Sequence, residues 1–442
     1  MKNRIYSILS VSAVALALLS SCTKDELTDE AIRLSRELAP VEAKGTPVVF
    51  ESSVISEQAE TRSQQTGELK NSNLNDIGVF AYYHDNGTYS SSSLPDFMYN
   101  QKVTRNGSTW DYSPVKYWPN ETTNDSEGPA SEHTDRISFL AYAPFTAEAD
   151  LAGNGSFGIT GFTGKNAAGD VKVSYRVSPT DPTQSVDLLW GVAGTTETAS
   201  PVNPSENSTT ENEPLLNLSK MITGGKVKFK FHHALTKLDV KVSLAVDQIP
   251  AGTTKENATK VLVEAFYFIP TETTEANLLG LEGTFNLNTT YTAGSTVGWE
   301  SITSRYDKAK GEATSLEIAD NLKYTSASDF DSKAGAPAES VTANFPSLLK
   351  EGKPLMFIPL AGNTAYKYNV RIIYHVLTKD NEGVKDVRND ITYTGVEIPF
   401  RQDCAYSLST IIGLNSVKFE VEAVDWDPVI KAVTMRSTNE VF

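Results

Sequence analysis

The stretch Val227-Lys228-Phe229-Lys230-Phe231-His232 places an apolar side chain at every second position, and the same alternation returns in Leu238-Asp239-Val240-Lys241-Val242. A period of two is that of a β-strand with one buried face and one wet face. Similar short segments, rich in valine, phenylalanine and tyrosine, recur along the chain and are separated by Gly, Asn, Asp, Ser and Pro. The alternation therefore predicts an all-β chain.

The predicted strands begin near residue 48 and continue almost to the C-terminus. They lie at 48–50, 77–83, 137–143, 171–177, 227–231, 238–246, 261–269, 355–359, 368–376, 406–412 and 417–424. Two packed sheets can bury facing apolar rows while leaving polar rows in water. We therefore expect two tandem antiparallel β-sandwich domains, with few helices.

A boundary between the two domains is expected near residue 219. The stretch 195–217 is too polar, and too rich in Ser, Thr, Pro and Glu, to supply a core strand before Leu215. The sequence thus predicts an N-terminal sandwich over residues 46–219 and a C-terminal sandwich over residues 220–442.

The N-terminus carries the pattern of a lipoprotein signal. Lys2 and Arg4 precede an apolar run that is closed by Leu19-Ser20-Ser21-Cys22. A charged start, a short apolar core and small residues before a cysteine form a secretory signal whose cleaved end is lipid-modified on the thiol. A transmembrane helix is the weaker interpretation, because such a helix needs roughly 20 apolar residues. We expect a signal peptide over 1–21, a lipid on Cys22 and a polar tether over 22–45.

Charge and cysteine content exclude several classes of function. The formal net charge is -16 and becomes -18 once residues 1–21 are removed, because they carry Lys2 and Arg4 and no acidic residue. Such acidity argues against binding to nucleic acid or to anionic lipid through basic patches. With Cys22 lipidated, Cys404 is the remaining thiol, so no intramolecular disulfide is expected. We expect Cys404 to be a small buried apolar residue.

An ordered set of motifs resembles the fimbrillin family of Bacteroidetes, the Mfa-like and FimA-like pilins. The set extends from the lipobox to the final tryptophan, and its members are Pro114-Val115-Lys116-Tyr117-Trp118-Pro119, Ile137-Ser138-Phe139-Leu140-Ala141-Tyr142-Ala143-Pro144, Asp187-Leu188-Leu189-Trp190-Gly191, the segment 227–238, Phe357-Ile358-Pro359-Leu360 and Trp426. The resemblance implies two transthyretin-like sandwiches, no enzyme activity and no cofactor. It also implies a subunit that travels to the cell surface as an outer-membrane lipoprotein and then joins a fimbrium.

The stretch Thr23-Lys24-Asp25-Glu26 is similar to the signal that exports Bacteroidetes lipoproteins to the cell surface. A plain polar tether is the alternative, because charged residues after a lipid anchor also keep that anchor solvated.

The family resemblance further implies a cut by a trypsin-like or arginine-specific protease, followed by loss of the first strand. The candidate processing site is Arg62, which lies in a polar stretch, and an ordinary solvated loop arginine is the alternative. The candidate removable strand comprises Val48, Val49, Phe50, Val54 and Ile55. Its loss would expose unpaired backbone groups and core positions, which a strand from another fimbrillin subunit would fill.

The donor strand is expected in the tail 427–442. Val429, Val433 and Met435 share one face of an extended strand there. The alternative is that this segment is the last strand of the second sandwich. The sequence also leaves open a host or bacterial surface ligand, and the position of the subunit as stalk, tip or anchor.

Catalytic and metal-binding motifs do not stand out. The five histidines, His84, His133, His232, His233 and His375, show no ligand spacing on one element. The neighbours His232 and His233 should point to opposite faces of their strand, one toward the core and the other toward water.

The main alternative function is a stand-alone glycan-binding lipoprotein of a polysaccharide-uptake system. It requires the five tryptophans, Trp110, Trp118, Trp190, Trp299 and Trp426, to expose their rings on one face. Their positions at predicted strand ends favour rings that fill the sandwich cores instead.

Overall fold

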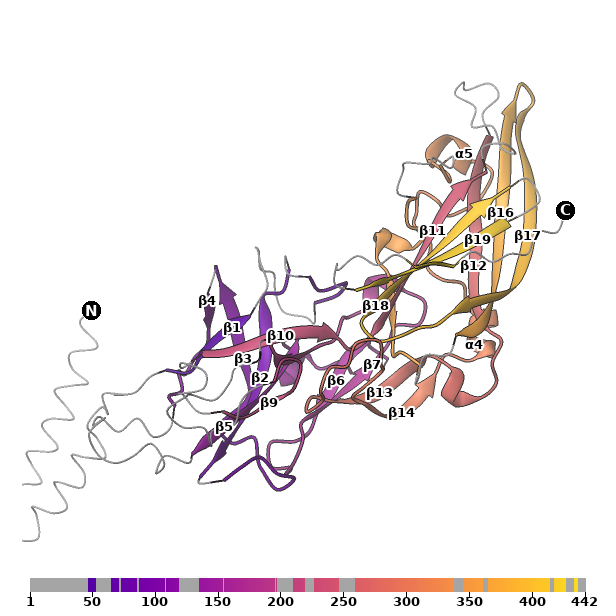
Figure 1. Ribbon diagram of the computed structural model, residues 1–442. Coiled ribbons are helices and arrows are strands. Elements are labelled where there is room, and N and C mark those ends of the chain that lie inside the picture. The colour runs from indigo at the N-terminus through magenta and orange to yellow at the C-terminus, as the bar shows by residue number, and fades with distance from the viewer. Residues whose placement is uncertain are drawn as a thin grey trace, which may run out of the picture. The chain divides into compact units, whose positions relative to one another are not determined.

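The computed structural model describes residues 47–52, 65–70, 73–85, 87–107, 109–118, 135–153, 155–194, 196, 210–218, 226–245, 259–337, 345–360, 365–413, 417–426 and 433–435. These residues form a nearly all-β fold, which confirms the expected class (Figure 1). The helical elements in them are short: α4 (Lys308–Ala313), α5 (Asp329–Ser332) and the 3-10 turns η3 (Glu148–Asp150), η4 (Pro182–Gln184), η5 (Glu275–Asn277) and η6 (Lys350–Gly352).

The largest sheet has eight strands. They are β1 (Val49–Ser52), β2 (Asp76–His84), β3 (Met98–Asn106), β4 (Thr109–Asp111), β5 (Arg136–Ala143), β8 (Leu189–Ala193), β9 (Leu215–Leu218) and β10 (Lys226–His233). The pairings run from β1 through β4, β3, β2, β5, β8 and β10 and back to β1, so this sheet closes on itself.

The central strands of this closed sheet are buried on both faces. In β2, Val79 and Ala81 belong to a core on one side of the sheet, while Phe80 and Tyr82 belong to a second core on the other side. The same division holds in β5 and β8. Burial on both faces explains why these strands read as continuous apolar runs rather than as alternating patterns.

A four-stranded sheet packs beside this closed sheet and contains β6 (Gly158–Phe162), β7 (Lys172–Arg176), β13 (Gly280–Asn286) and β14 (Trp299–Arg305). Strand β7 pairs with β13, and β10 pairs with β1 and β8. Two sheets therefore combine strands from before and after residue 219.

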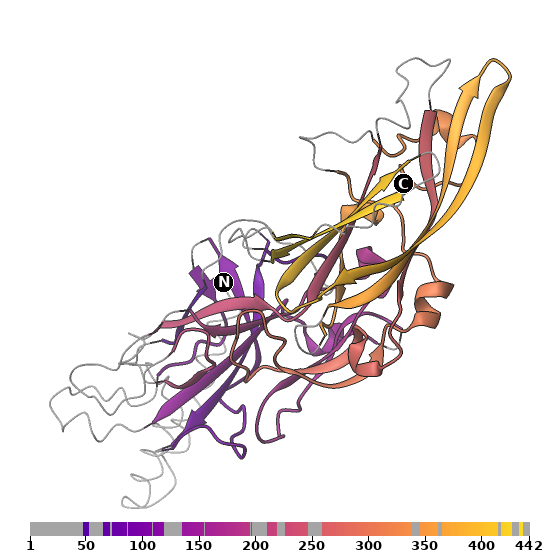
Figure 2. The ribbon, with the colours of Figure 1, turned by 45° about the vertical axis from the view of Figure 1, so that its right-hand side comes forward.

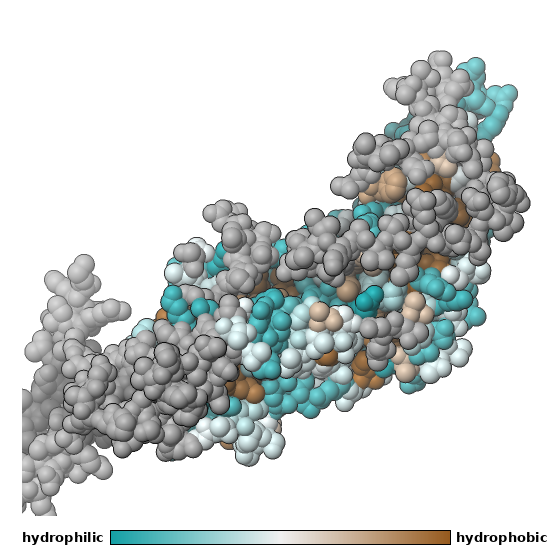
Figure 3. Space-filling model, viewed as in Figure 1, coloured by the Kyte–Doolittle hydropathy of each residue, from teal (hydrophilic) through white to brown (hydrophobic). Residues whose placement is uncertain are grey.

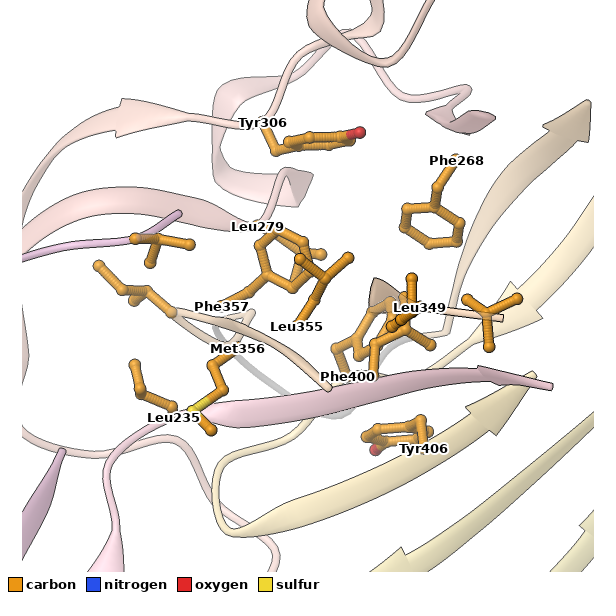
Figure 4. Close-up of a cluster of buried hydrophobic side chains, with 14 of the residues drawn as sticks. Leu235, Phe268, Leu279, Tyr306, Leu349, Leu355, Met356, Phe357, Phe400 and Tyr406 are labelled. Atoms are coloured by element: carbon orange, nitrogen blue, oxygen red, sulfur yellow. The ribbon is translucent and has the colours of Figure 1, made fainter. Parts of the chain in front are cut away.

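Two further sheets come from the C-terminal half. One contains β11 (Thr236–Leu244), β15 (Leu355–Phe357), β18 (Cys404–Ile412), β19 (Val417–Asp425) and β20 (Val433–Met435), and the other contains β12 (Thr259–Pro270), β16 (Tyr366–Asp380) and β17 (Gly383–Ile398). The long β16–β17 hairpin lies beside β12 (Figure 2). Side chains of Phe268, Phe400 and Tyr406 pack between these sheets (Figure 4).

Two pairings between named strands of the described residues are parallel, which differs from the expected antiparallel sheets. Strand β1 runs parallel to β10, and β11 runs parallel to β18. Both parallel pairs join segments more than 150 residues apart in sequence, and alternation within one strand carries no information on the direction of its neighbour.

The described residues expose few large apolar side chains. On the face shown in Figure 3, brown apolar patches are interrupted by teal and white residues. The large apolar side chains with clear exposure are Val49, Tyr83, Leu94, Val115, Tyr117 and Val387. No helix of the described residues is both long and apolar enough to span a bilayer.

Candidate functional site

The first strand, β1, lies between β4 and β10 within the closed sheet. It pairs with β10 from Val49, opposite Lys226, to Ser52, opposite Phe229. On the other side Phe50 pairs with Trp110 of β4. The strand is therefore held on both edges, and its loss would leave a slot between two other strands.

Backbone groups just before the strand are also bonded. The amide of Val48 donates to the carbonyl of Lys116 at 2.9 Å, and the Tyr112 hydroxyl donates to the carbonyl of Val48 at 2.9 Å. A segment that took the place of β1 would have to satisfy the same partners.

The side chains of residues 48–50, at the start of β1 and just before it, alternate between the core and the surface. Val48 and Phe50 are each 1% exposed, whereas Val49 is 38% exposed on the outer face. The ring of Phe50 lies among Tyr112, Phe139 and Phe229, with centroids 5.3, 6.0 and 6.2 Å away. Two side chains of the candidate strand thus fill core positions, one of them in an aromatic pocket. Val54 and Ile55 lie outside the described residues.

The chain is anchored again a few residues beyond Arg62, which itself lies outside the described residues. The Gly67 amide donates to the Ser185 carbonyl at 2.7 Å, and the Leu69 amide donates to Asp187 Oδ2 at 2.9 Å. Leu69 is buried, with 1% of its surface exposed. None of these partners belongs to β1, so the segment 65–70 is held in place independently of β1.

Glu68 connects this segment to distant parts of the chain. Its Oε1 lies 2.5 Å from Lys237 Nζ and accepts a hydrogen bond of 2.9 Å from Trp426 Nε1. Its Oε2 lies 3.1 Å from Lys70 Nζ. Burial alone would raise the pKa of Glu68, but the two lysines outweigh it and lower the pKa, so the carboxylate is ionised at neutral pH.

His232 and His233 correct the expectation that one of them faces water, because both are buried. His232 Nδ1 lies 3.1 Å from Asp403 Oδ2, and His233 Nδ1 lies 2.9 Å from Asp187 Oδ2. Carboxylates on opposite sides of the strand partner the two rings, so each face buries a histidine that has a polar partner.

Aromatic rings cover both histidines. His232 stacks on Tyr291 with centroids 3.5 Å apart, and His233 stacks on Trp426 at 3.9 Å. Burial opposes protonation of His233, but Asp187, with Asp403 and Glu68, raises its pKa above the usual 6.5. We call the group Glu68, Asp187, His233, Lys237 and Trp426 the Glu68 cluster.

Asp187, His233 and Trp426 belong to three separate motifs of the sequence, and nothing in the sequence predicted that they are in contact. The structure places all three in the Glu68 cluster. Glu68 and Asp403 were missed, since neither lies in a recognisable pattern. The one signal for acidic partners was the adjacent pair His232 and His233, because buried histidines need polar or charged partners.

The candidate donor segment is described only in part. Val433–Met435 forms β20, which pairs antiparallel with β19, Val433 opposite Ala423 and Met435 opposite Val421. Val429 lies outside the described residues. The described part of the segment, β20, therefore lies at one edge of the five-stranded sheet of this chain.

The tryptophans do not form an exposed platform. Trp110, Trp118, Trp190 and Trp426 are at most 7% exposed, and Trp299 is half-buried with its Nε1 donating to the Ala234 carbonyl at 2.7 Å. The core-filling interpretation is confirmed for four of the five rings. Cys404 is partly rather than fully buried, at the start of β18.

The part of the chain that the structure describes holds no group of three or more His, Cys, Asp or Glu side chains placed to bind a metal ion. Its other buried histidines are taken up by local partners. His84 Nε2 lies 2.9 Å from the Ser138 hydroxyl, and His375 bonds Asp386 and Glu264.

The geometry defines a class of protein: a nearly all-β chain whose first strand is clamped between two others and is followed by a separately anchored segment. In sequence it is similar to the fimbrium subunit Fim1C of Phocaeicola vulgatus, with 24% identity over 358 residues, 78% of this chain and 80% of that protein. Its fold matches that of a fimbrial protein from Bacteroides vulgatus, with a TM-score of 0.54 and 19% identity, over 86% of this chain and 99% of that one. No protein-family model matches the chain. The resemblance to Bacteroidetes fimbrial proteins that the motifs indicated is confirmed.

Proposed function

We propose that the protein is a fimbrial subunit that reaches the cell surface as a lipoprotein and assembles by protease-triggered strand exchange. The observation that carries the proposal is the placement of β1 between β4 and β10, followed by a separately anchored segment at 65–70. Arg62 lies in the sequence between these two anchored parts. The fimbrial relative supports the same role.

A cut at Arg62 would separate β1 from the rest of the fold without disturbing the anchors at Ser185 and Asp187. The lipid on Cys22 would leave together with the strand. Two core positions would then be exposed, each worth about 1.5 to 3 kcal/mol when filled by a large apolar side chain. The backbone groups of β4 and β10 that β1 leaves unpaired would also favour the addition of another strand.

The tail offers a matching segment. Val433-Thr434-Met435 repeats the spacing of Val48-Val49-Phe50, with apolar residues two positions apart. The thioether of Met435 would suit the aromatic pocket that holds Phe50, because sulfur packs favourably against aromatic rings. In the described residues, β20 pairs with β19 through Val433, Thr434 and Met435, so its use as a donor requires these pairs to open.

The remaining parts of the proposal follow from the family resemblance. They are two tandem transthyretin-like sandwiches over residues 46–219 and 220–442, a location in the fimbrium, and other fimbrillin subunits as partners. The subunit needs no catalytic group and no cofactor in this role. The tryptophans do not favour the glycan-binding alternative, which requires their rings to be exposed on one face.

The lipid anchor is tested in the native host with a radiolabelled fatty acid. The full chain should incorporate label, and Cys22→Ser should not. Labelling of both chains, or of neither, would contradict the anchor while leaving strand exchange open to its own test.

A further inference from the structure

The Glu68 cluster joins two segments that have separate tasks in the proposed assembly. Glu68 lies six residues after Arg62, in the segment that becomes the N-terminus when the chain is cut. Trp426 is the last residue before the tail 427–442. One carboxylate oxygen, Glu68 Oε1, accepts the indole hydrogen bond of Trp426.

The indole is held from several directions. His233 stacks on it with an interplanar angle of 9°, and Lys237 Nζ lies 5.2 Å from its ring centroid. Its backbone amide donates to the Asp403 carbonyl at 3.0 Å. The side chain is 7% exposed. Trp426 is therefore fixed in both backbone and side chain.

A second route connects the same two segments without Glu68. Asp187 Oδ2 accepts the amide hydrogen of Leu69 and also lies 2.9 Å from His233 Nδ1. His233 in turn carries the stacked Trp426. Side chains from four separate parts of the chain thus meet where the segment 65–70 lies against Trp426, and none of them comes from β1.

We propose that Glu68 is a positioning residue that fixes the point from which the donor tail leaves the subunit, by tying Trp426 to the segment that follows the cut. This inference rests on the proposed function, since it assigns a role within strand exchange. The tie persists after cleavage, because both of its ends lie on the retained side of Arg62. Loosening it should impair the subunit as a donor and leave its groove intact as an acceptor.

The tie itself is tested by amide hydrogen exchange on the mature, uncut chain, with Cys22→Ser so that no lipid is attached. We expect Glu68→Ala to speed exchange of the Trp426 amide about tenfold, and Trp426→Ala to speed exchange of the Gly67 and Leu69 amides by a similar factor, because local opening sets exchange. Glu397→Ala removes an exposed pair with Lys367 and serves as the control that changes neither. Unchanged exchange in either Glu68→Ala or Trp426→Ala would overturn the tie.

The donor role is tested after trypsin treatment by comparing two measurements. Cut Glu68→Ala should bind a synthetic peptide of residues 427–442 within about twofold of cut wild type, yet polymerise at least about fivefold more slowly. Glu68→Gln keeps an acceptor for Trp426 Nε1 but loses the charge opposite Lys237. Its polymerisation rate should lie between those of wild type and Glu68→Ala. It also serves as the test variant if Glu68→Ala does not fold.

Polymerisation of the Glu68 variants at the wild-type rate, or an equal loss of peptide binding and polymerisation, would overturn the positioning role. Failure of the proposed function gives a different result. Wild type would then neither polymerise nor bind the peptide after the cut, whereas the exchange experiment would still report on the tie.

Discussion

The ring of Phe50 in β1 stacks on the ring of Phe229 in β10, with centroids 6.2 Å apart and planes inclined by 14°. The two residues are 179 positions apart in sequence and belong to parallel neighbouring strands. The first strand is thus part of the core through a contact with a strand that any cut at Arg62 leaves in place. Whatever replaces β1 must fill the same space.

Phe50→Ala should lower the free energy of unfolding by about 3 to 5 kcal/mol, because it empties a packed aromatic pocket. Val49→Ala is the matched control, because it removes two methyl groups from the exposed face of the same strand. It should change the free energy of unfolding by less than about 0.5 kcal/mol. Denaturant unfolding of the uncut chain measures both. Equal effects of the two substitutions would show that β1 does not bury Phe50 as described.

Gly78→Ala should lower the free energy of unfolding by about 1 to 3 kcal/mol through overpacking. A Cβ at Gly78 would lie 2.0 Å from Cε1 of Tyr142, its partner across β2 and β5. Tyr142 has little freedom to move, since its hydroxyl donates to Asn100 Oδ1 at 2.7 Å.

Gly161→Ala is the control for this prediction, because the nearest atom to its added Cβ is 3.9 Å away, and it should be close to neutral. Thermal unfolding of the two variants makes the comparison. A neutral Gly78→Ala would contradict the close approach of β2 and β5.

The strands with apolar patterns could be predicted from the sequence, and their partners could not. Strand β16 was expected because its residues 368–376 are mostly apolar. Strand β17 was missed, because residues such as Lys385, Arg388 and Asp390 interrupt its apolar pattern. Its two buried side chains, Val396 and Ile398, lie at its C-terminal end, and the rest of the strand is defined mainly by its pairing with β16. The intrinsic pattern is a weak signal where an edge strand buries few of its side chains.

The candidate site shows the same division. The apolar character of Val48 and Phe50 indicated a strand, but its position between β4 and β10 depends on pairing over long sequence separations. Likewise, His232 and His233 are both buried because Asp403 and Asp187 arrive from elsewhere in the chain. Alternation places two neighbours on opposite faces but cannot tell that both faces are covered.

The pH dependence of stability should carry the signature of His233. Its folded pKa is raised above the unfolded value near 6.5, so its contribution is fully present below pH 6.5 and is lost as pH rises through the folded pKa. His233→Asn should therefore destabilise the protein more at pH 6 than at pH 9. Chemical unfolding across this range is the measurement.

His84 provides the opposite control, because burial lowers its pKa. Its contribution is present above the unfolded pKa and is lost as pH falls through the folded pKa, so His84→Gln should change the profile in the reverse sense. If His233→Asn destabilised the protein equally at both pH values, the charged pair with Asp187 would not exist in solution.

Binding of the tail to the cut protein should depend on Met435 far more than on Thr434. In the proposed register Met435 enters the aromatic pocket of Phe50, where a charge would be desolvated without a partner, so Met435→Asp should weaken peptide binding at least about tenfold. Thr434 takes the exposed position of Val49, and Thr434→Ala should change affinity by less than about twofold. Calorimetric titration with peptides of residues 427–442 measures both, and a reversed order of sensitivity would refute the register.

The central claim is that a cut at Arg62 opens a groove that another subunit fills. Limited trypsin treatment of the purified protein, followed by N-terminal sequencing and electron microscopy, tests it most directly. We predict a new N-terminus at Ser63 together with filaments or a ladder of oligomers, and an Arg62→Ala chain that is not cut at this site and stays monomeric. A wild-type chain that is cut at Arg62 and remains monomeric, or that resists the cut, would contradict the account.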